Sequence, residues 1–167
     1  HRTFEVNEVG DVVFDKTEII APGEVLDVAG RAGDEVVDAN DAPAFFEEAV
    51  AFCQQHDIVL VHDFPYGDMV FSNIQVPSIL QADREKSVSI EFFTLSKSYN
   101  MGGFRVGYAI GNSEIIEALR QVKAVVDFNQ YQGIFNGAIA ALKGSQDTVK
   151  TSVETFRKRR DAFVDAL

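Results

Sequence analysis

Two kinds of hydrophobic pattern divide the chain. Beyond about residue 42, apolar residues recur every three or four positions in some stretches, as in amphipathic helices, and form short continuous runs in others, as in strands buried on both faces. Because helices and strands alternate here, this part is predicted to form a layered α/β fold with right-handed crossovers. The expected helices cover residues 41–56, 77–81, 114–126, 131–142 and 147–166, and the expected strands cover 58–61, 88–93 and 105–110.

The first forty residues follow a different pattern. They hold five short β-branched runs, which are separated by turn signals such as Pro22-Gly23 and Gly33-Asp34. Short strands that break every few residues predict a small antiparallel meander or hairpin array. The runs cover residues 3–9, 11–14, 18–21, 24–28 and 35–38.

The charge distribution changes at the same place. The chain carries a net charge of −11, and residues 1–44 account for −8 of it, with eleven acidic and three basic side chains. We therefore expect a boundary near Asp41, between an acidic β-rich segment (residues 1–41) and an α/β domain (residues 42–167). The acidity argues against binding to nucleic acid or to an anionic membrane surface.

Composition narrows the class of protein further. The apolar runs are far too short to cross a bilayer, and no signal peptide is visible, so we expect a soluble cytoplasmic protein. The chain begins with His1 rather than methionine, which predicts a trimmed or partial chain. Cys53 is the single cysteine, so an internal disulfide is excluded. It is expected in the core. The three histidines and one cysteine lack metal-site spacing, so no metal is expected.

Four residue types in a fixed order suggest a specific chemistry. Asp63 and Tyr66 follow an expected strand, and Lys97 and Arg105 follow the next one. An amine that forms an imine, a carboxylate for a pyridine nitrogen, a phenol for a ring oxygen and a guanidinium for a phosphate match the needs of pyridoxal phosphate. In such sheets ligands bind beyond the carboxyl ends of the strands. Two hydroxyls precede the lysine, those of Thr94 and Ser96.

Each of these residues also has an ordinary structural interpretation. The alternatives are a solvated surface lysine for Lys97, a turn cap for Asp63, a half-buried tyrosine for Tyr66 and a surface ion pair for Arg105. The basic run at residues 157–160 resembles a nucleic-acid patch, but acidic neighbours on the same expected helix favour a solvated face. His62, beside Asp63, is expected to be buried and satisfied.

The motifs Asp63-x-x-Tyr66 and Thr94-x-Ser96-Lys97, followed by Arg105, resemble those of fold-type I, class I/II pyridoxal-phosphate aminotransferases. The resemblance runs from about residue 45 to residue 167. It implies part of the three-layer α/β sandwich of the large domain, preceded by the small β-rich segment. It also implies pyridoxal 5'-phosphate as cofactor, an amino acid and a 2-oxo acid as substrates, and a homodimer.

The resemblance assigns a role to each residue. Lys97 is the Schiff-base lysine and proton shuttle, Asp63 the partner of the pyridinium nitrogen and Tyr66 the partner of the ring oxygen. The cofactor phosphate is assigned to three residues, Arg105, Thr94 and Ser96.

Three parts of the family pattern are missing from the chain. An Asn-Pro-(Thr/Asn)-Gly step is replaced by residues 33–37, and neither the earlier half of the large domain nor the small domain is present. We therefore expect a partial or rearranged aminotransferase whose preferred amino acid cannot be read from the sequence. The alternative is a non-catalytic fusion, in which an acidic β module and an aminotransferase remnant act as a binding or scaffold unit.

Overall fold

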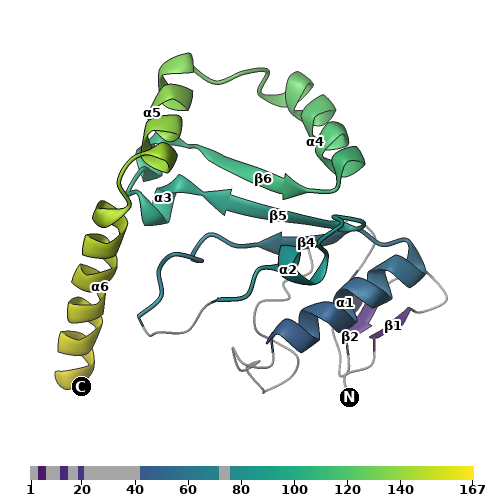
Figure 1. Cartoon of the computed structure of the whole chain (residues 1–167), viewed down its shortest axis with the longest axis horizontal. Helices are drawn as coiled ribbons and strands as arrows, with labels where there is room; N and C mark the ends of the chain where they lie inside the picture. The colour runs from purple at the N-terminus through teal and green to yellow at the C-terminus, as the bar shows by residue number, and fades with distance from the viewer. Residues whose placement is uncertain (1–3, 7–11, 15–18, 21–41, 72–75) are drawn as a thin grey trace. The chain divides into compact units, whose positions relative to one another are not determined.

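The computed structural model describes residues 4–6, 12–14, 19–20, 42–71 and 76–167 (Figure 1). The chain forms two compact units that are interleaved in sequence. The first unit comprises residues 1–63, 77–91 and 110–113, and the second comprises 64–76, 92–109 and 114–167.

Three short strands near the N-terminus form an antiparallel sheet in the order β1-β2-β3. Their register sets Phe4 opposite Phe14 and Val12 opposite Ile20. They match the first three predicted runs, while the runs at 24–28 and 35–38 and the boundary at Asp41 lie outside the described residues. The strands are β1 (Phe4–Val6), β2 (Val12–Phe14) and β3 (Ile19–Ile20).

The core of the first unit is built on helix α1 (Ala42–His56), which confirms the first predicted helix. Its buried side chains recur at three- and four-residue spacing, so they line one face of the helix. Cys53 is one of them, as expected, and burial raises the pKa of its thiol to about 11, so it stays protonated and unreactive. The buried cluster consists of Phe45, Phe46, Ala49, Val50, Cys53, Leu60 and Ile79.

A capped helical turn follows in the first unit. Ser78 begins α2 (Ile79–Ala82): its Oγ accepts a hydrogen bond from the Leu80 N–H at 3.2 Å, and its own N–H donates to Gln81 Oε1 at 3.3 Å. This reciprocal capping box explains why so short a helix forms. The helix lies one to two residues later than predicted.

Asp83 organises the turn that leads into the next strand. Its carboxylate accepts hydrogen bonds from the backbone N–H groups of Ser87, Val88 and Ser89 at 2.9–3.1 Å and from two serine hydroxyls. Burial alone would raise the pKa of Asp83, but these hydrogen bonds outweigh it and lower the pKa to about 2. The buried carboxylate is therefore ionised and fully satisfied near neutral pH.

The second sheet has the strand order β4-β5-β6, and its first two strands are β4 (Leu60–Asp63) and β5 (Ser89–Thr94). The N–H groups of Leu60 and Phe64 donate to the carbonyls of Val88 and Phe92, each at 2.9 Å. From the first bond to the second, the donor and the acceptor each move four residues forward in sequence, which is the pattern of parallel strands. The predicted strands are confirmed with small shifts in their bounds.

The third strand, β6 (Gly107–Gly111), runs antiparallel to β5. Leu95 N–H donates to Val106 O at 3.3 Å, and Asn112 N–H donates to Ser89 O at 2.8 Å. The residue number therefore increases along β6 where it decreases along β5. The connection holds only two short turns, α3 (Leu95–Ser98) and the 3₁₀ turn η1 (Gly102–Phe104). These turns reverse the chain without the crossover helix that a parallel strand needs, which corrects the expectation of uniform strand–helix–strand crossovers.

The second unit contains the remaining helices and a smaller core. Leu95, Val106 and Ala138 are its buried apolar cluster, onto which Met101 and Ile134 pack. None of the residues of α4 is buried. The helices match the three predictions for this part of the chain within a residue, as α4 (Ser113–Val126), α5 (Gln132–Lys143) and α6 (Asp147–Asp165).

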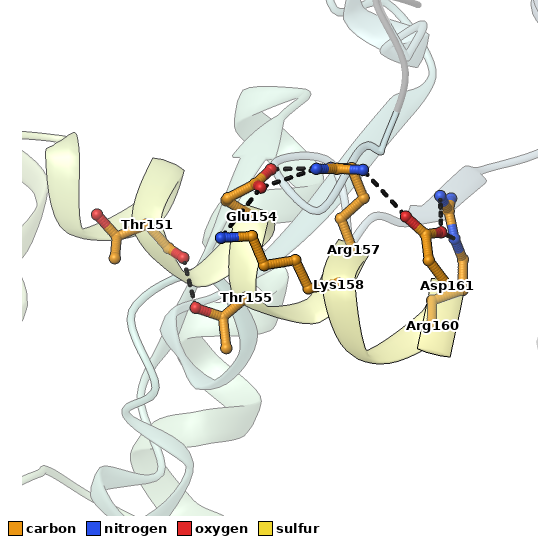
Figure 2. A network of polar contacts seen from close by, with 7 residues as sticks. All are labelled: Thr151, Glu154, Thr155, Arg157, Lys158, Arg160 and Asp161. Atoms are coloured by element: carbon orange, nitrogen blue, oxygen red, sulfur yellow. Dashed lines mark hydrogen bonds and ion pairs between the residues drawn. The ribbon is translucent and has the colours of Figure 1, made fainter. Parts of the chain in front are cut away.

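Three of the four basic residues in the run on α6 form ion pairs within their own helix (Figure 2). Arg157 donates to both oxygens of Glu154 at 2.8 Å and to Asp161 at 3.0 Å, while Lys158 lies 3.6 Å from Glu154 and Arg160 bonds Asp161 at 2.6 Å. These exposed ion pairs give the solvated face predicted for residues 157–160. Among the described residues, no helix combines the length and apolarity needed to cross a membrane.

Candidate functional site

Lys97 lies on a capped helical turn that follows the middle strand of the second sheet. Thr94 ends β5 in an extended conformation, and its Oγ1 accepts a hydrogen bond from the Ser96 N–H at 3.1 Å. This cap begins α3 (Leu95–Ser98), so the loop expected around the lysine is a turn of helix. The Lys97 side chain is exposed to solvent.

The structure brings Lys97 together with Tyr66. The ammonium Nζ lies 5.2 Å from the centroid of the Tyr66 ring, within the range of a cation–π contact. Tyr66 lies in a tight turn, in which its carbonyl accepts the Met69 N–H at 2.9 Å, and its side chain is 57% exposed. Amine and phenol are therefore adjacent and open to a ligand.

Arg105 has an unusual backbone. It directly follows η1 with a φ of 52°, in the left-handed region. Its Nη1 donates to Gly102 O at 3.1 Å, and its own carbonyl accepts from Gln130 Nε2 at 2.6 Å. Because a guanidinium has five N–H donors, the contact with Gly102 leaves most of them for a ligand.

A pocket of about 570 Å³ lies within the second unit, with Arg105 among its lining residues. Its wall is aromatic: Phe93 and Tyr108 stack with ring centroids 4.8 Å apart, and Phe128 and Phe135 also line it. Phe93 and Tyr108 fall in predicted strands and Phe135 in a predicted helix, while Phe128 falls between two predicted helices. No pattern in the sequence indicates that they enclose a pocket, because apolar residues at this spacing are typical of any core.

Asp63 belongs to the first unit, where it ends β4. Its side chain is exposed. The preceding residue, His62, is buried as expected: its Nδ1 lies 3.3 Å from Glu91 Oε1, and its ring packs on Phe46. The Ser78 hydroxyl donates to the other oxygen of Glu91 at 2.5 Å.

The predicted site residues are thus divided between the units. Lys97, Tyr66 and Arg105, with the hydroxyls of Thr94 and Ser96, belong to the second unit, and Asp63 belongs to the first. Among the described residues, no group of three histidine, cysteine or acidic side chains is placed to hold a metal ion.

Residues 42–167 match the family described as aminotransferase class I and II, and the chain belongs to this family. It is 42% identical over 123 residues to the glutamate-pyruvate aminotransferase AlaC of Escherichia coli K12, a match that covers 74% of this chain and 30% of AlaC. It is 46% identical to an LL-diaminopimelate aminotransferase of Dehalococcoides mccartyi, again over 74% of this chain and 32% of that protein. The chain thus spans about a third of the length of the curated relatives it matches.

Solved structures agree with this assignment. A probable N-succinyldiaminopimelate aminotransferase from Thermus thermophilus has a TM-score of 0.69 and 39% identity, over 75% of this chain and 34% of that one. BacF from Bacillus subtilis, solved with substrate bound, has a TM-score of 0.67 and 35% identity, over 75% and 31%.

These comparisons confirm the resemblance and the fold class, a portion of the α/β large domain of a fold-type I aminotransferase. Pyridoxal 5'-phosphate is the cofactor of this family. Its members act on amino acids and 2-oxo acids and are typically homodimers. The roles of the individual site residues and the division of the chain at Asp41 remain predictions.

Proposed function

We propose that this chain is the cofactor-binding part of a pyridoxal-phosphate aminotransferase, with Lys97 as the residue that binds the cofactor covalently. The observation that carries the proposal is the pairing of the Lys97 amine with the Tyr66 ring at 5.2 Å, on the capped turn within the family match. A lysine that is only solvated requires no phenol as a neighbour.

The donor set of the second unit fits the cofactor. Pyridoxal phosphate presents an aldehyde, a phenolic oxygen and a phosphate, and the second unit offers an amine, a phenol and a guanidinium together with two hydroxyls. Lys97, Tyr66 and Arg105 are all exposed, so a ligand can reach each of them. The Thr94 oxygen accepts a bond from Ser96 N–H but keeps its own proton to donate.

When bound, the cofactor supplies an aldehyde and an electron-withdrawing ring. In the proposed site Lys97 would hold the cofactor covalently through its amine, with loss of water, and would move the substrate proton. Tyr66 would donate a hydrogen bond to the ring oxygen, and the Asp63 carboxylate would hold a proton on the ring nitrogen.

The phosphate is assigned to Arg105, with Thr94 and Ser96. A guanidinium forks onto two phosphate oxygens, and hydroxyl donors satisfy the third. The family match supports this assignment, because all three residues fall within residues 42–167.

The substrate class and assembly follow from the family and are part of the same proposal. The substrates are an amino acid and a 2-oxo acid, and the active form is a homodimer. The acidic segment of residues 1–41 is a separate module. A cytoplasmic setting is consistent with the single cysteine, which is buried in a core.

The test is to add pyridoxal phosphate to the chain, record the absorbance of the adduct, trap it with borohydride and map the labelled peptide. Label on Lys97 supports the proposal. Lys150→Ala is the matched control, because Lys150 is an exposed lysine of the same unit in an exposed ion pair. Lys97→Ala should abolish the adduct and Lys150→Ala should retain it. Label spread over many lysines, unchanged in Lys97→Ala, would favour the non-catalytic scaffold instead.

A further inference from the structure

One side-chain contact joins the two segments that carry Lys97 and Tyr66. The Ser98 hydroxyl donates to Asp68 Oδ2 at 2.7 Å. Ser98 directly follows Lys97, and Asp68 lies two residues after Tyr66. The bond therefore ties the lysine turn to the tyrosine turn beside the point where the two site side chains meet.

The Asp68 side of this contact is set by a compact turn. Met69 N–H bonds back to Tyr66 O, so residues 66–69 form a closed loop. Gly67 fits against the ring of Phe64: a Cβ at Gly67 would lie 2.6 Å from a ring carbon. The loop is thus packed on its inner side, and Asp68 is its polar link to α3.

The Ser98 side is also fixed. Ser98 is 3% exposed, and the next two residues are bonded to the region of α6: Tyr99 Oη donates to Gln146 Oε1 at 2.7 Å, and Asn100 Nδ2 to Ser152 Oγ at 3.0 Å. Burial and then the charge of Asp68 raise the pKa of Tyr99, which is a second sign that the carboxylate faces this turn. The lysine turn is held on one side by α6 and on the other by Asp68.

We infer that Asp68 and Ser98 are positioning residues, and that their hydrogen bond holds the Tyr66 ring against the Lys97 amine. Lys97 and Tyr66 are long, exposed side chains that lose rotamer entropy when ordered, and a 5.2 Å contact between them alone is weak at an exposed site. A hydrogen bond to a carboxylate is stronger, and it fixes the backbone from which both side chains project. The relevance of this contact to cofactor binding rests on the proposed function.

The first test needs no cofactor. The Tyr66 ring current should shift the NMR signal of the Lys97 ε-methylene upfield from the other lysines, and Tyr66→Leu should remove that shift. Asp68→Ala and Ser98→Ala should each remove most of it. Asp68→Asn should retain it, because the amide oxygen still accepts the Ser98 hydroxyl. Asp161→Asn is the control: it removes the same charge from an ion pair of α6 and should leave the Lys97 shift unchanged.

The second test measures the affinity for pyridoxal phosphate. Asp68→Ala and Ser98→Ala should each weaken binding about tenfold, the effect of one hydrogen bond to a charged group. The double variant should be no weaker than either single variant, because both remove the same bond. Asp68→Asn should bind with an affinity between those of Asp68→Ala and the wild-type chain, because a neutral hydrogen bond replaces a charged one.

The outcomes separate this inference from the proposed function. An unchanged Lys97 shift in both Asp68→Ala and Ser98→Ala overturns the positioning role, whatever the cofactor does. If the variants lose the NMR shift but the wild-type chain never carries label at Lys97, the positioning contact is upheld and the proposed function is overturned. Far-UV circular dichroism identifies a variant that fails to fold, and the conservative Ser98→Ala then decides the question.

Discussion

The two units differ in how much apolar surface they bury. In the first, seven apolar side chains from α1, β4 and α2 form one buried cluster. In the second, the described cluster has three buried members, and α4 contributes none of them. On α4, Val125 is 85% exposed and Val126 is 76% exposed.

This contrast separates stability from chemistry. Buried apolar area is the main source of folding free energy, so the first unit should dominate the resistance of the chain to unfolding. The second unit carries the exposed amine, phenol and guanidinium, which must be reachable in order to bind a ligand. Substitutions in the buried cluster of the first unit should therefore change stability, and substitutions of Lys97, Tyr66 or Arg105 should change ligand binding.

The largest expected effect concerns turnover. We expect the 167-residue chain to convert the aldehyde form of the cofactor to the amine form slowly or not at all, because it spans about a third of its relatives' length. Positioning of substrate and cofactor can supply about 7–11 kcal/mol of barrier reduction, and it depends on groups throughout such an enzyme. Single-turnover assays with alanine, aspartate and glutamate measure this. Rates of about 1–10³ s⁻¹, typical of whole enzymes, would contradict the expectation.

The next effect tests the packing contrast directly. Ile79→Ala should lower the free energy of unfolding by about 2–5 kcal/mol, because Ile79 is 2% exposed in the larger cluster. Val125→Ala on α4 should change it by less than about 0.5 kcal/mol. Urea unfolding of both variants measures the difference. Equal losses would mean that the exposed face of α4 is buried in solution.

A pH titration sharpens the comparison. Asp83 has a pKa lowered to about 2 by its hydrogen bonds, so its stabilisation is complete above its ordinary pKa and disappears as the pH falls through about 2. The cost of Asp83→Asn should be about 2 kcal/mol larger at pH 7 than well below pH 2, where the Asp83 carboxyl is protonated.

Glu154 on α6 is the control for this titration, since hydrogen bonds from Arg157 lower its pKa to about 2 as well. Its carboxylate is exposed, so added salt should erase the effect of Glu154→Gln but preserve that of Asp83→Asn. Salt sensitivity of the Asp83 effect would show that this carboxylate is open to solvent.

The smallest effect is expected at the N-terminus. Removal of residues 1–41 should shift the free energy of unfolding of the remainder by less than about 0.5 kcal/mol, because the described core cluster takes its members from residue 45 onward. Chemical denaturation of residues 42–167 alone measures this. A loss of cooperative unfolding would mean that the boundary at Asp41 does not separate two modules.

Much of this architecture follows from the hydrophobic pattern. The stripe from Phe45 to Cys53 predicts α1 and its buried face, because helical spacing leaves few alternative ways to bury those side chains. The antiparallel direction of β6 could not be predicted, because it depends on how two short turns reverse the chain between residues 95 and 106. The capping hydroxyl of Thr94, which converts the lysine loop into a helical turn, acts over only two residues and leaves no periodic signal.

The sequence proposes the residues of the candidate site but not their arrangement. Side-chain chemistry and motif order single out Lys97 and Tyr66, and the structure supplies their contact. The Asp68–Ser98 hydrogen bond spans thirty residues of sequence, so no local pattern indicates it. The exposure of Asp63 is likewise a property of the fold, because an aspartate at a strand end is compatible with burial or with solvent.

The positive φ of Arg105 has a consequence for engineering this chain. An arginine held in the left-handed region costs about 1 kcal/mol, which a glycine at the same position would not incur. A selection for thermal stability alone should therefore favour glycine at residue 105, and the survivors would lack the guanidinium assigned to the phosphate. A more stable version of this protein would then be a poorer receptor for the proposed cofactor.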